Sequence, residues 1–279
     1  MQTFLLIIFS LVFSSAFAQN KVIEDQFKYK AVYKLTYAPD STNIKKVKSE
    51  DFNLYVGNKI SIFASRGRVM RDSLKLHLQD RDLSSIDFGE RAKRTKTEFE
   101  SVIYKGFPEA KISYSYKILR DKLTYEEDLN QFSWEILPET QTIQGYKTQK
   151  AKTSFAGRNY IAWFTSEIPI SDGPYKFNGL PGLILEIMDA KNHYHYKLAS
   201  FQKINSDKVV LKTSNFLKSD KEEVLERVNE YKLNPFAVLE RNNTAERNVT
   251  INFKDGQKEK LLREKKEKLA KKNNPIELE

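Results

Sequence analysis

The strongest constraint on the fold is the alternation of apolar and polar side chains along several short segments. In FKYKAVYKLTY, residues 27–37, every second residue is apolar, and lysines occupy three of the positions between them. A strand with one buried and one wet face has this period of two, because successive side chains point to opposite faces of a sheet. Residues 51–63, DFNLYVGNKISIF, repeat the pattern on both sides of Gly57-Asn58, which predicts a β-hairpin.

Six further segments have the composition of strands. Turn residues separate most of them, and their spacing favours antiparallel pairing over strand–helix–strand units. The sequence therefore predicts a mainly β protein (β-rich α+β), whose antiparallel sheet forms an open or partly closed barrel with two or three flanking helices. The six segments are residues 111–119, 132–137, 158–168, 183–188, 193–204 and 208–213.

Three segments predict helices. Residues 68–79 are amphipathic, and residues 220–233 follow Ser219, a residue type that caps helices, with Glu222 three positions on. Residues 257–272 are highly charged with a sparse apolar face, which fits a helix lying on the sheet or a partly disordered tail. Two segments have the character of connections, residues 94–106 and 234–248.

The first residues have the pattern of a secretory signal peptide. An apolar run over residues 4–13 precedes Ala16-Phe17-Ala18, so we expect cleavage after Ala18. The run is shorter than the roughly 20 apolar residues of a transmembrane helix, although a retained anchor is the alternative. The expected organisation is a signal peptide over 1–18, a single β-rich domain over 19–255, and a basic helical or disordered tail over 256–279.

The chain has no cysteine, which excludes a disulfide framework, a thiol nucleophile and a lipid-anchored lipoprotein. The net charge is +10, and residues 257–272 hold eight Lys or Arg against three Glu. For an exported protein, in the periplasm, outer-membrane-associated or secreted, this charge predicts attraction to an anionic envelope surface and not to nucleic acid.

Catalytic patterns are scarce in this sequence. It has three histidines and no G-x-S-x-G, H-E-x-x-H, Walker or G-x-G-x-x-G motif. The one constellation that resembles a metal site is DAKNHYHY, in which His193 and His195 share a strand face and Asp189 is a candidate third ligand. The alternative is an edge strand with two inert histidines. No cofactor is required by the sequence.

Residues 143–187 carry a set of spaced motifs. Gly145, Tyr146, Lys150 and Ala151 form G-Y-x-x-x-K-A, and G-R-x-Y-x-A-W-F starts at Gly157. I-P-I-x-x-G-P follows from Ile168, and GLPGLI covers residues 179–184. This block resembles the GLPGLI family of exported Bacteroidetes proteins. The resemblance implies export from a bacterium with an outer membrane and implies no activity, because the family has no settled biochemical function.

The turn residues of the block predict a strand, a stiff double-turn loop and a second strand. Asn178-Gly179 tolerates positive φ, and Pro181-Gly182 makes a second tight turn. The loop is either a structural corner of the sheet or a fixed lip over a pocket. In the second interpretation the candidate ligand-binding residues are Arg158, Trp163, Tyr175, Gly179, Pro181 and Gly182.

Three functions remain open at this stage. The first is a non-enzymatic envelope binding or carrier module for a hydrophobic small molecule or peptide, since aromatic strand faces form either a core or a groove. The second is a structural component that binds an outer-membrane protein partner. The third is a metal-handling protein or metal-dependent enzyme that uses His193 and His195.

Overall fold

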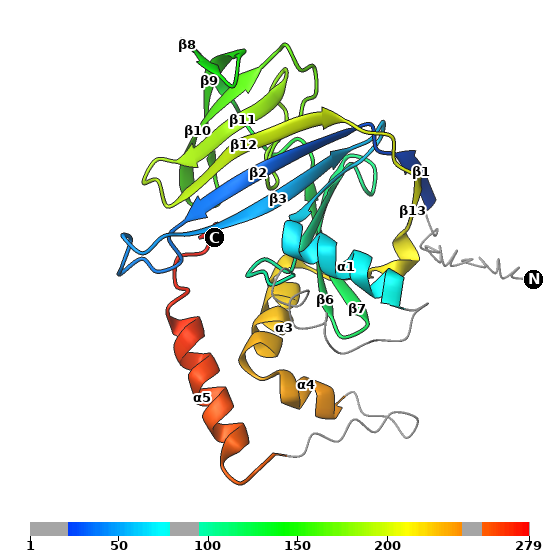
Figure 1. Ribbon diagram of the computed structural model, residues 1–279, viewed down its shortest axis with the longest axis vertical. Helices are drawn as coiled ribbons and strands as arrows, with labels where there is room; N and C mark the ends of the chain where they lie inside the picture. The colour runs from blue at the N-terminus through cyan, green and yellow to red at the C-terminus, as the bar shows by residue number, and fades with distance from the viewer. Residues whose placement is uncertain (1–21, 79–94, 242–252, 279) are drawn as a thin grey trace, which may run out of the picture.

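The computed structural model describes residues 22–78, 95–241 and 253–278 (Figure 1). Some parts of the predictions lie outside the described residues: the expected signal peptide, residue 79 of the first predicted helix, and residues 242–248 of the second predicted connection. Within the described residues, no helix is both long and apolar enough to span a membrane.

Twelve strands of the described chain form one sheet, in the order β14-β7-β6-β5-β4-β3-β2-β12-β11-β10-β9-β8, and β1 pairs separately with β13. All the pairs are antiparallel except β14 with β7. The strands are β1 (Val22–Gln26), β2 (Tyr29–Tyr37), β3 (Lys48–Val56), β4 (Ser61–Ser65), β5 (Val102–Lys105), β6 (Lys111–Ile118), β7 (Asp121–Asp128), β8 (Glu135–Ile143), β9 (Tyr146–Phe155), β10 (Arg158–Thr165), β11 (Leu183–Asp189), β12 (Tyr194–Lys203), β13 (Lys208–Lys212) and β14 (Leu217–Lys218).

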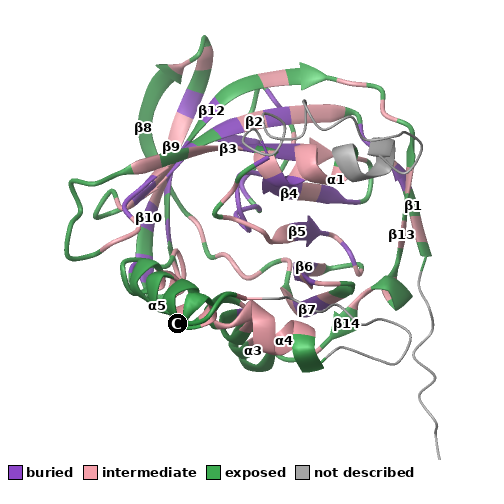
Figure 2. Cartoon of the chain, turned by 60° about the horizontal axis from the view of Figure 1, so that its bottom comes forward, coloured by how far each residue is buried: buried purple, intermediate pink, exposed green. Residues whose placement is uncertain are grey.

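The sheet curves strongly without closing, because β14 and β8 end it without pairing with each other. Figure 2 shows the strands curling round from β8 to β7, with α3, α4 and α5 along the open side. The helices are α1 (Arg66–Leu78), α3 (Lys221–Leu233), α4 (Pro235–Arg241) and α5 (Gln257–Ala270), and Thr213–Asn215 forms a short 3-10 helix. The prediction of a mainly β protein with flanking helices is confirmed, and the sheet is open.

The alternation that predicted β2 also builds the core. Ala31, Tyr33, Leu35 and Tyr37 are buried, whereas the residues between them are half-buried or exposed. They join the inward side chains of β3, β4, β10, β11 and β12 in one apolar cluster. A second cluster packs Val224 and other residues of α3 against β6 and β7. Helix α3 therefore covers part of the open side of the sheet.

Two segments were predicted as connections and contain regular elements. Residues 94–106 include β5, and residues 234–248 begin with α4. Both elements are short, with four and seven residues. Tertiary contacts decide such short elements more than their own sequence pattern does: β5 is paired on both sides, and α4 packs beside α3.

The loop over residues 166–182 folds back into the curve of the sheet. Gly179 and Gly182 have φ of 94° and 151°, so both predicted turns need glycine. A Cβ on Gly182 would lie 2.0 Å from the Thr165 carbonyl oxygen. Lys105, the last residue of β5, anchors the loop: its ammonium pairs with Asp172 and donates to the Gly173 carbonyl at 2.7 Å. Burial lowers the pKa of Lys105, although Asp172 opposes this effect.

We predict that Asp172→Asn destabilises the protein by about 3–5 kcal/mol, because it leaves the buried charge of Lys105 without its counter-ion. The matched control is Asp128→Asn, which breaks an exposed pair with Lys111 and should leave the stability nearly unchanged, because solvent screens that pair. Urea unfolding measures both. Equal stabilities of the two variants would contradict the anchoring role of Lys105.

Candidate binding site inside the curved sheet

A cavity of about 530 Å³ lies between the inner face of the sheet, α3, α5 and the last described residues. Aromatic residues are the largest group in its wall, seven of nineteen, and the lining side chains come from strands, from the 166–182 loop and from both helices. The main apolar and aromatic lining residues are Tyr37, Phe99, Tyr114, Tyr116, Tyr175, Tyr194, Tyr231 and Leu269.

The cavity tyrosines present neutral hydroxyls at physiological pH. Burial, with smaller contributions from Glu277 and Glu127, raises the pKa of Tyr114 to about 12. Burial also raises the pKa of Tyr194 to about 12. The pKa of Tyr175 lies well above its usual value because the side chain is buried and faces Glu277. Tyr175 and Tyr194 already donate their hydroxyl protons to Glu277 and to the Asn274 carbonyl, so these two offer a ligand the faces of their rings.

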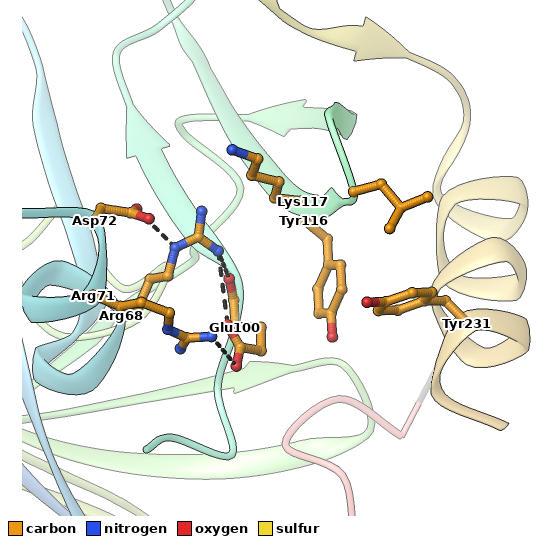
Figure 3. A pocket seen from close by; sticks show the side chains of 8 residues that line it. Arg68, Arg71, Asp72, Glu100, Tyr116, Lys117 and Tyr231 are labelled. Carbon is orange, nitrogen blue, oxygen red and sulfur yellow. Dashed lines mark hydrogen bonds and ion pairs between the residues drawn. The ribbon is translucent and has the colours of Figure 1, made fainter. Parts of the chain in front are cut away.

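A smaller charged pocket of about 320 Å³ (Figure 3) adjoins the cavity, and the two share Glu100, Tyr116 and Tyr231 as lining residues. Its two arginines are already paired. Arg68 Nε donates to Asp72 at 2.8 Å, and Arg71 Nη1 donates to Glu100 at 2.9 Å. With Lys117, the smaller pocket therefore has three cationic side chains against two carboxylates.

Lysines line the side of the cavity nearest α5. Burial lowers the pKa of Lys232, and the neighbouring Lys272 adds to this effect. The pKa of Lys265 is lowered for the same two reasons. Lys272 itself pairs with Glu98. The three lysines remain at least partly exposed to solvent, and they give this side of the cavity a positive charge that would attract an acidic group.

Residues 274–278, which we call the 274–278 segment, lie beside the cavity. We call the space that they occupy the cleft, and its walls are Arg158, Tyr160, Tyr175, Lys176, Tyr194 and Lys221. Side chains from the sheet donate hydrogen bonds to three consecutive carbonyl groups of the segment. Tyr194 Oη donates to the Asn274 carbonyl at 2.6 Å, and Arg158 Nη2 donates to the Pro275 carbonyl at 2.6 Å. Arg158 Nε and Tyr160 Oη both donate to the Ile276 carbonyl, at 3.1 and 3.2 Å. The segment is thus held by its main chain.

Two side chains of the segment are also bound. Asn274 donates to the Ala38 carbonyl at 2.7 Å and accepts from Arg158 Nη2 at 2.7 Å. The Glu277 carboxylate pairs with Lys176 Nζ at 2.5 Å and with Lys221 Nζ at 2.9 Å, and it accepts from Tyr175 Oη. Lys176 is 0% exposed and Glu277 is 11% exposed, so this ion pair is mostly removed from water.

Of the predicted ligand-binding residues, the structure brings Arg158 and Tyr175 together around the 274–278 segment. Tyr175 also lines the cavity. Trp163 projects to the opposite face of β10 from Ala162 and Phe164, where Lys150 Nζ lies 6.0 Å from its ring centroid. Three of the predicted residues shape the loop without lining the cavity: Gly179, Pro181 and Gly182.

The three residues of the predicted metal site each contact another side chain, and Asp189 and His193 share Arg158. Asp189 pairs with Arg158 at 3.1 Å and accepts from the Tyr194 amide. His193 Nδ1 lies 3.5 Å from Arg158 Nη1, and His195 Nε2 lies 2.6 Å from the Glu186 carboxylate. Across the described parts of the chain, no three His, Cys, Asp or Glu side chains are grouped so that they could hold a metal ion. The placement thus gives the metal hypothesis no geometric basis.

Sequence reasoning did not find most of this site. It missed Lys176, although a lysine between Tyr175 and Phe177 in an otherwise apolar turn is a signal of a buried charge. It also missed the 274–278 segment. The signal there is Asn274-Pro275: a proline disfavours helix at the residue before it, so the lysine-rich helix is not expected to continue through Asn274.

Comparisons with known proteins cover parts of the chain. A family described as "Protein of unknown function (Porph_ging)" matches residues 122–186, which run from β7 to β11 and include the 166–182 loop. No curated protein matches the chain. Solved structures of PNGF-II in C2 and P21 crystal forms are similar, each with a TM-score of 0.50, at 15% and 14% identity. These matches cover 74% of this chain but only 33% and 34% of PNGF-II, so they show a shared fold over about a third of that protein.

We predict that the 274–278 segment loosens in acid. Burial alone would raise the pKa of Glu277, but the ion pair with Lys176 and hydrogen bonds from Lys176, Tyr175 and Lys221 outweigh burial and leave the pKa below its usual 4.5. A depressed pKa stabilises the bound segment above pH 4.5, and this stabilisation is lost as pH falls through the lowered value.

Amide hydrogen exchange measures this loss. The amides of Asn274 and Leu278, which donate to Pro39 and Ala156, should lose protection below about pH 4.5 after correction for intrinsic exchange. Glu277→Gln should remove that pH dependence, whereas Glu267→Gln, an exposed site on α5, should keep it. A protection factor that does not change with pH in the wild-type chain would contradict the prediction.

Proposed function

We propose that the chain is an exported, non-enzymatic binding or carrier module of the bacterial cell envelope, with a hydrophobic or peptide-like ligand. The observation that carries the proposal is the tyrosine-lined cavity of about 530 Å³ inside the curved sheet. Its volume falls within the range of about 300–1,000 Å³ that is usual for small-molecule sites. Its wall combines flat apolar rings with a few polar tips, the mixture that orients such ligands.

The envelope location is part of the same proposal. It rests on the apolar leader over residues 1–18 and on the basic helix α5, whose lysines suit an anionic surface. We also propose membership of the GLPGLI family. The residues that resemble that family, 143–187, overlap the segment that matches the family of unknown function, 122–186.

The alternative of an outer-membrane assembly component has less support from the geometry. Such a component would pair through a free strand edge, and β8 is the exposed strand at one end of the sheet. Pro138 and a register shift between Ile136 and Thr140 interrupt that strand. Proline and bulges are the features by which natural sheets prevent pairing at an edge. The cavity therefore remains the better-supported site.

We predict that Leu269→Trp reduces binding of a neutral hydrophobic probe, N-phenyl-1-naphthylamine, by about tenfold or more, because the larger side chain fills the cavity. Leu261→Trp is the matched control: it lies on the same helix, is 40% exposed and does not line the cavity. Probe fluorescence gives both affinities. Equal affinity in the two variants would place the probe elsewhere and count against the cavity as the site.

Native mass spectrometry of the mature protein from a bacterial periplasm tests the ligand class directly. A reproducible added mass, lost in Leu269→Trp and retained in Leu261→Trp, would support the binding module and separate lipid from peptide by mass. If the measured mass is that of the polypeptide alone and the probe does not bind, the binding module loses its support and the outer-membrane assembly component becomes the favoured function.

A further inference from the structure

The cleft that holds the 274–278 segment has the construction of a peptide-binding site. We propose that it binds an extended segment of another protein chain, with the pattern Asn-Pro-apolar-acidic, and that the protein's own 274–278 segment occupies the same place in its absence. This inference rests on the proposed binding function and assigns a peptide as one class of ligand.

The main-chain contacts carry the first part of the argument. Three consecutive carbonyl groups accept hydrogen bonds from Arg158, Tyr160 and Tyr194, all side chains of β10 and β12. Any residue type offers the same carbonyl groups, so these donors would hold a foreign peptide equally well. Main-chain bonds that give affinity and side-chain pockets that give specificity are the usual division of labour in peptide recognition.

The Glu277 pocket carries the second part, because it selects for charge. Lys176 and Lys221 both pair with Glu277, and their other carboxylate partner there is Glu127. When Glu277 leaves, two cations face one carboxylate, and Lys176 is 0% exposed. Of its two described carboxylate partners, Lys176 then keeps Glu127, at 2.6 Å, and has to share it with Lys221, so the pocket carries a net positive charge. Because a buried cation is stabilised by each nearby carboxylate, the vacated pocket favours an acidic group from a ligand.

The Asn274 pocket selects for an amide. The Asn274 side chain, 5% exposed, donates to one carbonyl and accepts from Arg158, so both ends of the amide are used. Ile276 between the two pockets packs on the main apolar cluster, whereas Pro275 is exposed. The spacing of one amide, one apolar and one acidic contact defines the pattern of the expected ligand.

The helix that leads to the segment is weakly held. α5 has no buried residue, and its contacts within the described chain are mainly with α3. Little apolar surface must therefore be exposed when α5 and the segment move away. The segment also forms part of the cavity wall through Asn274, Pro275 and Ile276, so its departure would widen the cavity.

The test uses the full chain and a fluorescent peptide with the sequence of residues 271–278, KKNNPIEL. In the wild-type chain the attached segment competes at an effective concentration of about 1 mM, so the peptide should bind only in the millimolar range. Glu277→Gln in the chain weakens the attached segment by removing charge-assisted hydrogen bonds. Fluorescence anisotropy should then show binding of the peptide that is about tenfold tighter or more.

Two matched controls identify the cause. Glu267→Gln on α5 removes the same charge at an exposed position, and it should leave the millimolar affinity unchanged. A peptide with glutamine at the position equivalent to Glu277 should bind the Glu277→Gln chain about tenfold more weakly than the KKNNPIEL peptide. If neither peptide binds the folded Glu277→Gln chain, the inference is overturned.

Hydrogen exchange on the wild-type chain covers the case in which the variant does not fold. The Leu278 amide should exchange by local opening, well before the amides of β2. If it exchanges only together with β2, the segment never leaves the cleft and the inference fails. If the hydrophobic probe binds in the cavity and the peptide does not bind, this inference alone is wrong. If the peptide binds but neither the probe nor an added mass in native mass spectrometry is found, only the cavity is wrong as a ligand site.

Discussion

The buried ammonium group of Lys176 is the interaction on which the site depends. It joins three parts of the chain that are far apart in sequence: the 166–182 loop, β7 through Glu127, and the 274–278 segment through Glu277. Four aromatic rings lie within 6 Å of it, among them Tyr125 at 5.0 Å from its ring centroid. A cation removed from water this completely tolerates few arrangements of its neighbours, so it fixes the loop, the strand and the segment relative to one another.

Much of the sheet was predictable, because many of its strands record their own environment in their sequence, although β7 and β9 lie outside every segment that was predicted as a strand. In β2 the period of two already separates the core residues, such as Tyr33 and Leu35, from the wet face. The turns at Gly179 and Gly182 were predictable for the same local reason, since positive φ favours glycine. Short elements such as β5 and α4 were not, because their neighbours in space determine them.

The site was only half predictable. Arg158 and Tyr175 belong to the motif block that supplied the candidate ligand-binding residues, and both contact the 274–278 segment. Their partners come from residues 274–278 and from α3, and no local pattern states which distant segment will meet a given face. The alternation of apolar and polar residues predicts which side chains of a strand point inward, but it does not predict which distant segment packs against them. Trp163 lies apart from Arg158 and Tyr175 because successive side chains of a strand point to opposite faces, and Trp163 is one residue from the inward-pointing Ala162 and Phe164.

The order of the chain adds a consequence in time. Every strand, the loop with Lys176, and α3 precede residue 274 in the sequence. Ribosomes and export channels deliver a polypeptide from its amino end, so the residues that build the cleft emerge before the segment that fills it. There is therefore an interval during synthesis in which Arg158, Lys176 and Lys221 have emerged and Glu277 has not. Under the peptide-binding proposal, another acidic sequence could enter the cleft in that interval, and the tethered segment would then have to displace it.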